Sequence, residues 1–439
     1  MFSRRHILAG SLASAALLAG ARRQAYATDV DVVVVGAGAA GISAARELMT
    51  LGRKVVVLEA RDRLGGRVFT DTSLGVPYDA GAMFIHWAER NPWNKIARDL
   101  NVPTIDDSWR GGGFQVFSGG RPMSDGERNN RRGAFGRMER LLDQAAATGR
   151  DMSVAEAVSS LGPELAPIAA SGLLLSLGED AERISVLDYE ALWAGDDLQV
   201  PSGYGNLVSR YGEGLGVRLS TPVTTIRWDG PGVEVETASG TLRAKACIIT
   251  VSVGVLQANA IRFTPELPVE TRNAIGQIGM GALTKMAFKA DRKRLGMAPQ
   301  TFLEAGKPSN LMMVDLFPEE QDLIVCNFGG NYARDISNSG PEAAKAHVRD
   351  LLVSMIGGQA RAVLGEASFP AWWTDPWSRG SYSIVKPGFM GAREALAEPI
   401  GNRIWLAGEA SSIGGAMTVG GASLAGMAAA RGAAAKTKA

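Results

Sequence analysis

The segment from Asp29 to Glu59 limits the possible folds of this chain more than any other. It reads as a valine-rich strand, a glycine turn, an amphipathic helix and a second strand, which is the order of a βαβ unit. The turn carries the pattern G-x-G-x-x-G at Gly36, Gly38 and Gly41. The first glycine permits the tight turn, the second lets the backbone approach a pyrophosphate, and the third lets helix and strand pack closely. The segment therefore predicts a Rossmann-like domain that binds a dinucleotide at the helix N-terminus.

Glu59 narrows the choice of dinucleotide. It lies at the end of the second strand, where an acidic side chain accepts hydrogen bonds from ribose hydroxyls. Because its charge would repel a 2′-phosphate, we expect FAD or NAD and not NADP. The alternative is a glycine-rich turn that binds no ligand.

The N-terminus is predicted to be an export signal, residues 1–27. The pair Arg4-Arg5 precedes an apolar stretch from Ile7 to Ala21, and an A-x-A triplet ends at Ala27. This pattern is typical of a twin-arginine signal, whereas an amphipathic helix of the mature fold would need a polar face that the stretch lacks. The expected partner is the twin-arginine export machinery, and the expected location is the periplasm or the cell exterior. No later run is long and apolar enough to predict a membrane span in the mature protein.

Charge and cysteine content exclude several functions. Lysine plus arginine total 46 and aspartate plus glutamate total 45. Without the four arginines of the signal, the balance is 42 minus 45, or −3, which argues against a nucleic-acid partner. Cys247 and Cys326 lie in apolar runs, so we expect two buried thiols and neither a disulfide nor a metal site.

Two further stretches resemble the flavin-containing amine oxidase family. Residues 58–70, LEARDRLGGRVFT, are similar to that family's second dinucleotide motif, and residues 402–426 resemble its third FAD segment. The resemblance implies FAD as the cofactor. It assigns FAD contacts to Gly36, Gly38, Ala39, Ala40, Gly41, Glu59, Ala60, Arg61, Gly65, Gly66, Arg67, Gly81, Ala82, Met83, Val223, Gly408, Glu409, Thr418 and Val419.

Four more stretches resemble the polyamine oxidase branch in a bacterial, exported form. They are residues 79–97, 251–268, 279–289 and 372–388. The last is also close to the lysine-specific histone demethylases. The demethylase interpretation is disfavoured because the sequence shows an export signal, no extra N-terminal chromatin domain and no long helical insertion.

The family resemblance implies an α/β fold with two domains. A Rossmann-like FAD domain is expected from the discontinuous residues 28–90, 200–262 and 400–439. A substrate domain with a mixed β-sheet and helices is expected from residues 91–199 and 263–399.

The reaction implied by the family is hydride transfer from the carbon beside an amine nitrogen to flavin N5. The imine formed hydrolyses to an aldehyde and an amine, and dioxygen is reduced to hydrogen peroxide. Only the neutral amine reacts, yet an alkylamine at pH 7 is about one part in 2,500 neutral, a deficit of about 4 to 5 kcal/mol. The site must therefore favour the neutral form, by burial or a nearby base.

Three residues are the catalytic candidates. Lys285 lies in an apolar segment and matches the lysine that holds a water against flavin N5 in the family, although a strand-edge lysine could also snorkel there. His86 matches a substrate-facing histidine, with a capping or core role as the alternative. Tyr382 matches an aromatic wall at the flavin face.

The substrate pocket is expected to include Trp87, Trp377 and Thr418, although either tryptophan could belong to the core. Thr418 stands where monoamine oxidases carry a second tyrosine, which favours the polyamine branch. Ser381 stands where they carry the cysteine that binds FAD, so we expect non-covalent FAD.

The substrate itself stays open at this stage. Carboxylates that could bind distal ammonium groups are Glu89, Glu179, Asp180, Asp196 and Asp197, although the favoured interpretation of each is a solvated surface charge. The alternatives are an amino-acid or cyclic alkaloid amine oxidase, a dehydrogenase that passes electrons to a periplasmic acceptor, and a secreted binding protein that keeps FAD for stability.

Overall fold

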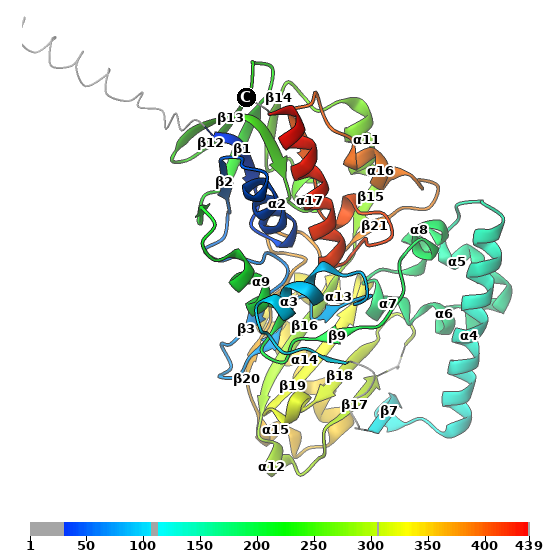
Figure 1. Cartoon of the computed structure of the whole chain (residues 1–439). Helices are drawn as coiled ribbons and strands as arrows, with labels where there is room; N and C mark the ends of the chain where they lie inside the picture. The colour runs from blue at the N-terminus through cyan, green and yellow to red at the C-terminus, as the bar shows by residue number, and fades with distance from the viewer. Residues whose placement is uncertain (1–29, 107–112, 305–306, 438–439) are drawn as a thin grey trace, which may run out of the picture.

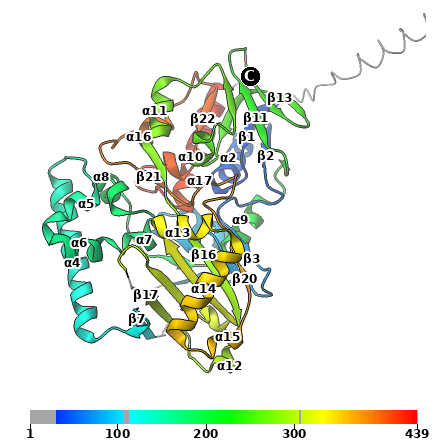
Figure 2. The ribbon, with the colours of Figure 1, turned by 180° about the vertical axis from the view of Figure 1, so that it is seen from behind.

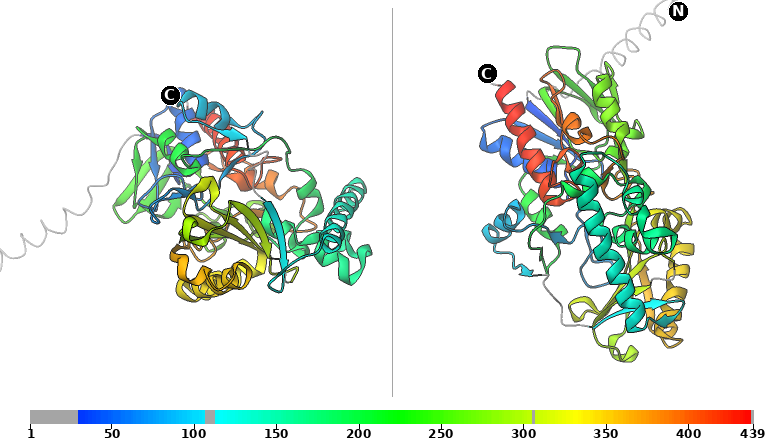
Figure 3. Two further views of the ribbon diagram at one scale, coloured as in Figure 1. Left: turned by 90° about the horizontal axis from the view of Figure 1, so that it is seen from below. Right: turned by 90° about the vertical axis from the view of Figure 1, so that its right-hand side faces the viewer.

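The structure, a computed structural model, describes residues 30–106, 113–304 and 307–437. Two lobes, each built on a sheet, lie one above the other, and an arm of helices projects to one side (Figure 1, Figure 3). The predicted export signal, residues 1–27, lies outside the described residues. Across the described part of the chain, no helix combines the length and apolarity that a membrane crossing requires.

The first lobe is built on a sheet whose central strands are parallel. Its order is β10 (Val217–Arg218), β2 (Val55–Leu58), β1 (Val30–Val35), β13 (Gly240–Ile249), β12 (Val233–Thr237), β11 (Val223–Arg227) and β14 (Arg262–Thr264), with β22 (Ile404–Leu406) beside β13. Valines of β1 are buried on both faces, as parallel strands require. Helices α2 (Ala39–Thr50) and α17 (Val419–Lys436) pack side by side on one face (Figure 1).

Glycines allow these close contacts. Gly36 has a φ of 103°, which a glycine adopts without strain. A Cβ at Gly41 would lie 1.9 Å from the carbonyl oxygen of Gly36, and one at Gly426 of α17 would lie 2.1 Å from that of Ala40. The turn and both helices therefore approach each other at a distance that only glycine permits, as the G-x-G-x-x-G pattern predicted.

The other face of the first sheet is covered by α10 (Val253–Gln257), from the predicted FAD domain, and by segments that were expected in the substrate domain. These segments are the helices α11 (Val269–Gln277) and α16 (Ala392–Ala397) and the pair β15 (Ile278–Met280) and β21 (Ser383–Val385). Ile275, Val385 and Leu396 share one core with Val33 of β1. The predicted boundaries at residues 262 and 400 are therefore displaced, because an amphipathic helix carries no signal for which sheet it covers.

The second lobe has a mixed sheet of non-consecutive strands. Its order is β20 (Leu364–Ser368), β16 (Leu283–Ala290), β19 (Leu323–Gly329), β18 (Met312–Leu316), β17 (Gln300–Glu304), β7 (Gly113–Ser118) and β8 (Arg121–Pro122). Helices α13 (Gly330–Asn338) and α14 (Pro341–Ile356) cover one face, with α12 (Arg292–Leu295) and α15 (Ala360–Val363) at the end (Figure 2). Phe288, Cys326 and Phe328 pack under these helices. The opposite face carries Lys285 and Asn327, because side chains alternate along a strand.

The remaining elements connect or flank the lobes. The arm contains α4 (Asp125–Ala147), α5 (Val154–Ala157), α6 (Gly162–Ala170), α7 (Leu173–Ser176) and α8 (Val186–Glu190). The helices α3 (Pro92–Asp99) and α9 (Tyr204–Gly212) pack against the first lobe, as does β5 (Phe84–Ile85), which pairs with β9 (Leu198–Gln199), itself paired with β6 (Ile105–Asp106). The pair β3 (Thr70–Asp71) and β4 (Tyr78–Asp79) packs through Tyr78 against the second sheet. Cys247 and Cys326 are buried free thiols, as expected.

The contact at Gly41 predicts the outcome of a substitution. Gly41→Ala places a methyl group against the carbonyl oxygen of Gly36 and should lower the free energy of unfolding by about 1 to 3 kcal/mol. Denaturant unfolding of the FAD-free protein measures this without a contribution from the cofactor. Gly276→Ala is the matched control, because a Cβ at this helical glycine meets no atom within 4 Å. Equal stability of both variants would contradict the packing role of Gly41.

Candidate active site

A large cavity opens at the carboxyl ends of the parallel strands β1, β2 and β13, where open α/β sheets bind their ligands. It encloses about 1360 Å³ including its mouth, and segments from both ends and the middle of the chain line it. The predicted residues in its lining are Gly36, Gly38, Ala39, Ala40, Glu59, Ala60, Arg61, Gly65, Gly66, Arg67, Gly81, Ala82, Val223, Lys285, Trp377, Tyr382, Gly408, Glu409, Thr418 and Val419.

Glu59 fixes the shape of the glycine turn. Its carboxylate accepts the Ala37 amide at 2.7 Å on one oxygen and the Arg61 amide at 2.8 Å on the other. Since each carboxylate oxygen has a second lone pair, Glu59 can still accept from ribose hydroxyls. The sequence predicted the ligand contact and missed the part that Glu59 plays in holding the turn.

The cavity fits a dinucleotide along its glycines. A Cβ at Gly408 would meet no protein atom within 4 Å, and one at Gly38 would meet only an oxygen at 3.8 Å. Protein packing therefore does not demand glycine at these two lining positions. Gly408 has a φ of 158°, which favours glycine by itself, whereas at Gly38 the close approach of a ligand to the backbone accounts for the glycine. Gly38 also caps α2 without a side-chain bond, which leaves the first amides of the helix directed at the cavity for a phosphate.

A buried ion pair joins two walls of the cavity. Arg67 Nη1 donates to Glu409 at 2.9 Å and to the Ser381 carbonyl at 2.6 Å. The other oxygen of Glu409 accepts the Ser383 hydroxyl at 2.5 Å. Burial raises the pKa of Glu409, but the charges of Arg67 and Arg393 and these hydrogen bonds outweigh it, so the pKa lies below the ordinary value of 4.5.

The network continues into the helical arm. Arg393 Nη1 donates to the Ser383 hydroxyl at 2.6 Å, and the same guanidinium binds both oxygens of Asp188 on α8 at 2.7 and 2.8 Å. Arg393, Asp188 and Glu409 are buried, whereas 26% of the Arg67 side chain is exposed. Neither Arg393 nor Asp188 was predicted, because no motif marks a charge pair between distant segments.

A second ion pair joins Arg61, in the cavity lining, to Asp375. Arg61 binds both oxygens of Asp375 at 2.8 and 2.9 Å, and Asp375 also accepts the Trp377 amide at 2.8 Å. Burial raises the pKa of Asp375, but the hydrogen bonds and charge of Arg61 hold it below its ordinary value. The bidentate geometry orients Arg61 and positions Trp377, which is 41% exposed at the cavity mouth.

Lys285 lies in the cavity wall on β16, and only 6% of it is exposed. Its Nζ donates to the carbonyl oxygens of Asp79 at 2.8 Å and Gly81 at 2.9 Å, and Trp372 Nε1 donates to that of Ala80 at 3.0 Å. Lys285 and Trp372 therefore bind the backbone carbonyl oxygens of three successive residues, Asp79, Ala80 and Gly81. The ammonium group is positioned rigidly, which a snorkelling lysine would not be.

Tyr382 and Thr418 complete the lining. Burial raises the pKa of Tyr382 to about 12, so its phenol is neutral at any physiological pH. Thr418 is the N-cap of α17: its hydroxyl accepts the Gly421 amide at 3.0 Å and donates to the Gly415 carbonyl at 2.7 Å. The Thr418 hydroxyl therefore makes the hydrogen bonds of the helix cap, although the side chain also lines the cavity.

Four predicted residues do not line this cavity. Gly41 acts in packing, and Met83 lines a second, smaller cavity. His86 Nδ1 lies 2.9 Å from Asp197 in a pair that is over one-third exposed. Trp87 is 2% exposed and packs edge-on against Trp193, with ring centroids 5.1 Å apart. Trp87, which was predicted to line the substrate pocket, is instead a buried core residue.

Of the five carboxylates proposed to bind distal ammonium groups, those of Glu89, Glu179, Asp180 and Asp197 are engaged within the protein. Glu179 is buried and accepts from Arg183 and Arg334, and Asp180 accepts from Arg183 at 2.6 Å. Glu89 accepts the Asp196 amide at 3.0 Å, and Asp197 pairs with His86. Among the residues that the structure describes, no group of His, Cys, Asp or Glu is arranged to hold a metal ion.

Comparisons with known proteins agree with this geometry. The profile of a family described as flavin containing amine oxidoreductase matches residues 39–169 and 186–434. Polyamine oxidase 4 of Oryza sativa subsp. japonica is 30% identical over 92% of this chain and 88% of its own length. Probable polyamine oxidase 4 of Arabidopsis thaliana is 32% identical over 87% and 82%. The structure of wild-type putrescine oxidase bound to putrescine has a TM-score of 0.76 at 21% identity, covering 92% of this chain and 99% of the other, which establishes the shared fold.

The Glu409 pair predicts a pH dependence of stability. Glu409→Gln should lower the free energy of unfolding at pH 7 by about 3 kcal/mol, because it leaves Arg67 without its buried counter-charge. A carboxyl whose pKa is lowered by folding stabilises the protein above the pKa of the unfolded state and loses that contribution as the pH falls through the folded value. The difference between wild type and Glu409→Gln should therefore shrink below about pH 4.5.

Urea unfolding between pH 7 and pH 3.5 measures this difference. Glu270→Gln, on the exposed face of α11, removes the same charge outside the network and should leave the pH profile unchanged. A constant difference between wild type and Glu409→Gln at every pH would contradict the lowered pKa.

Proposed function

Because the chain belongs to the flavin-containing amine oxidoreductase family, we propose that it oxidises a polyamine or another secondary amine and passes the electrons to dioxygen. Two relatives that cover most of the chain are named polyamine oxidases, which supports this substrate class. The observation that carries the proposal is one cavity in which residues of all three FAD motifs meet Lys285 and Tyr382.

The glycine turn, Arg67 and the segment from Gly408 to Val419 would hold FAD, which when bound would supply the two-electron acceptor for the hydride on the carbon next to nitrogen, with dioxygen as the final oxidant and hydrogen peroxide as its product. The amine carbon becomes an imine carbon. Water then adds to the imine and the carbon–nitrogen bond breaks, which gives an aldehyde and a shorter amine. The sum is amine, dioxygen and water in, and aldehyde, amine and hydrogen peroxide out.

The chain favours the neutral amine through Lys285 and Tyr382. The ammonium of Lys285 donates to two carbonyls, and this fixed positive charge in the wall disfavours a second one on the substrate nitrogen beside it. Tyr382 is a neutral aromatic surface at physiological pH, and it excludes water from the reacting carbon. A role for His86 stays a prediction, since its ring does not line the cavity.

We also propose that FAD is bound without a covalent link. Ser381 replaces the cysteine of the monoamine oxidases, and the described lining of the cavity contains no cysteine. The two cysteines of the chain lie in the cores of the two sheets, on β13 and β19. Trichloroacetic acid should therefore release all of the flavin into the supernatant.

The amine-oxidase proposal is tested by anaerobic mixing of the yellow protein with a panel of amines, followed by air. Bleaching by a polyamine with rapid recolouring supports it. Bleaching without recolouring indicates a dehydrogenase with another acceptor, and no bleaching by any amine contradicts amine oxidation. An amino acid or cyclic amine as the best substrate would replace the polyamine assignment.

Lys285→Met tests the assigned role of the lysine. This variant keeps the length and burial of the side chain and removes its charge, so flavin should still bind and show its normal absorbance. We expect anaerobic bleaching or reoxidation in air to slow by at least about a hundredfold. Lys289→Met, an exposed position on the same strand, is the matched control. Unchanged rates in both half-reactions would remove Lys285 from the mechanism.

Export in the folded state, with delivery to the periplasm or the cell exterior, is a further part of the proposal. It rests on Arg4-Arg5, the apolar stretch and the A-x-A triplet. Replacing both arginines with lysine should retain flavin-loaded precursor in the cytoplasm, as cell fractionation and immunoblotting would measure. Replacement of Arg22 and Arg23 with lysine is the control, and export of both variants alike would contradict a twin-arginine signal.

A further inference from the structure

Arg393, in the first turn of α16, uses every donor of its guanidinium group. Its Nε and Nη2 donate to the two carboxylate oxygens of Asp188 on α8. Its Nη1 donates to the Ser383 hydroxyl at 2.6 Å and to the Ala410 carbonyl at 3.2 Å, and Nη2 also donates to the Ser383 carbonyl at 3.1 Å. A guanidinium has five N–H groups, and only 3% of Arg393 is exposed. Arg393 therefore joins three distant segments of the chain in one fixed geometry.

Two of these segments lead directly into the wall of the large cavity. Tyr382 precedes Ser383 and Glu409 precedes Ala410, and both Tyr382 and Glu409 line the cavity. The Ser383 hydroxyl accepts from Arg393 and donates to Glu409 at 2.5 Å, and the Ser383 amide donates to the same carboxylate oxygen at 3.3 Å. The backbone next to each wall residue is therefore held by Arg393.

The core of the helical arm reaches the same part of the wall. Ile384, the residue after Ser383 on β21, is 2% exposed and belongs to the arm core together with Val186 of α8. Met417 packs against this core, lines the cavity and donates its amide to Glu409 at 3.2 Å. Because successive side chains of a strand point to opposite faces, β21 directs Ser383 to the charge network and Ile384 to the arm.

Polar contacts attach α8 to this strand and to the loop that follows it. The Ser185 amide donates to the Val385 carbonyl at 3.2 Å, and the Val385 amide donates to Asp188 at 3.4 Å. The Ser185 hydroxyl donates to Asp151 at 2.5 Å, and Asp151 accepts the Met390 amide at 2.9 Å. Movement of α8 away from β21 would break these bonds and the bidentate ion pair, and a buried arginine without its counter-charge is strongly unfavourable.

We propose that Arg393 is a positioning residue that couples docking of α8 to FAD binding. With α8 docked, Arg393 holds Tyr382 and Glu409 in the positions that form the wall of the FAD cavity, and bound FAD in turn holds α8 in place. Such a coupling is reciprocal: docking of α8 tightens FAD binding by the same factor by which FAD favours docking. The inference goes beyond the proposed amine oxidation and does not depend on which amine is oxidised.

Amide hydrogen exchange of the mature chain, with and without FAD, measures the coupling, because exchange reports local opening of a segment. Peptides that cover α8 should exchange at least about tenfold more slowly with FAD, since a hydrogen bond to a charged group contributes a factor of this size. Peptides of α14, on the outer face of the second sheet, are the internal reference and should slow less. Equal slowing of α8 and α14, or no slowing of α8, overturns the coupling.

Asp188→Asn tests the ion pair itself. It removes the charge that Arg393 binds, so it should raise the dissociation constant for FAD at least about tenfold and abolish the FAD-dependent slowing of α8. Titration of the FAD-free protein, followed by flavin absorbance, measures the dissociation constant. Agreement between the factor lost in FAD affinity and the factor lost in slowing is the signature of reciprocal coupling. Unchanged FAD affinity and unchanged slowing overturn it.

A double variant separates coupling from stability. Asp188→Leu with Arg393→Met removes both buried charges and keeps apolar side chains in their place, which is often neutral for folding. Its melting temperature without FAD should lie close to that of the wild type, while FAD affinity falls and the slowing of α8 is lost. A pair that only stabilises the fold would leave FAD affinity and the slowing as they are in the wild type, and that result overturns the assignment of Arg393.

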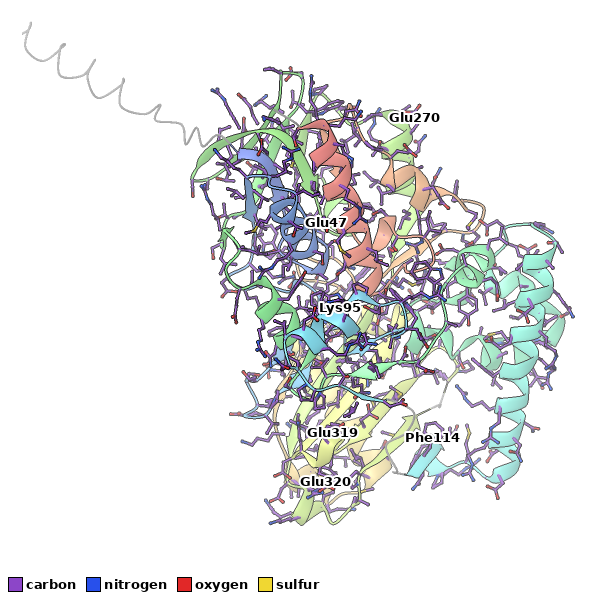
Figure 4. The ribbon with its side chains drawn as sticks, in the orientation of Figure 1. Glu47, Lys95, Phe114, Glu270, Glu319 and Glu320 are labelled. Carbon is purple, nitrogen blue, oxygen red and sulfur yellow. The ribbon has the colours of Figure 1, made fainter. Side chains whose placement is uncertain are left out.

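Glu47→Gln is the matched control. Glu47 of α2 pairs with Arg431 of α17 at 3.0 Å, so this pair also joins distant segments, and Glu47 lies on the first lobe, to the left of the arm in Figure 4. The variant should change neither FAD affinity nor the exchange of α8, and an effect equal to that of Asp188→Asn overturns the specific coupling. A wild type that binds FAD without slowing of α8 overturns the coupling alone, whereas one that binds no FAD overturns the proposed function as well.

Discussion

The pairing of Arg67 with Glu409 is the interaction on which the cavity depends. Arg67 follows the first βαβ unit, and Glu409 follows β22 near the end of the chain, so the pair joins segments that lie more than three hundred residues apart. Ser383, Arg393 and Asp188 extend it to the helical arm. Because Glu409, Arg393 and Asp188 are buried, each requires its partner. The network therefore specifies how three distant segments meet around one ligand.

The glycine turn and the position of Lys285 could be predicted from the sequence, because glycines and charges in these patterns have few structural interpretations. Gly36 and Gly41 are confined to glycine by a positive φ and by a contact that no Cβ allows, and both constraints follow from the turn itself. Lys285 stood out because an apolar strand does not bury an ammonium without partners. In each case the local sequence contains the physical reason.

Other features could not be predicted, since their cause lies in another segment. Trp87 and Trp193 fill one core together, and nothing near either residue indicates the other. Glu179 resembled a substrate-binding carboxylate until Arg334, far along the chain, was seen to neutralise it. Asn327 and Asp315 lie in ordinary strand patterns, and only strand order and register bring them to the face that carries Lys285.

The contact between α2 and α17 has a consequence for the order of events during synthesis. Ala40 and Gly426 touch, so the last long helix packs on the first one. The ribosome has made almost the entire chain before Gly408, Glu409 and Thr418 exist to complete the cavity wall. Until then, the glycine turn lacks the residues of this later segment that line the same cavity. A complete FAD site therefore forms only after α17 has been synthesised and has packed on α2, so cofactor capture is a late event in folding.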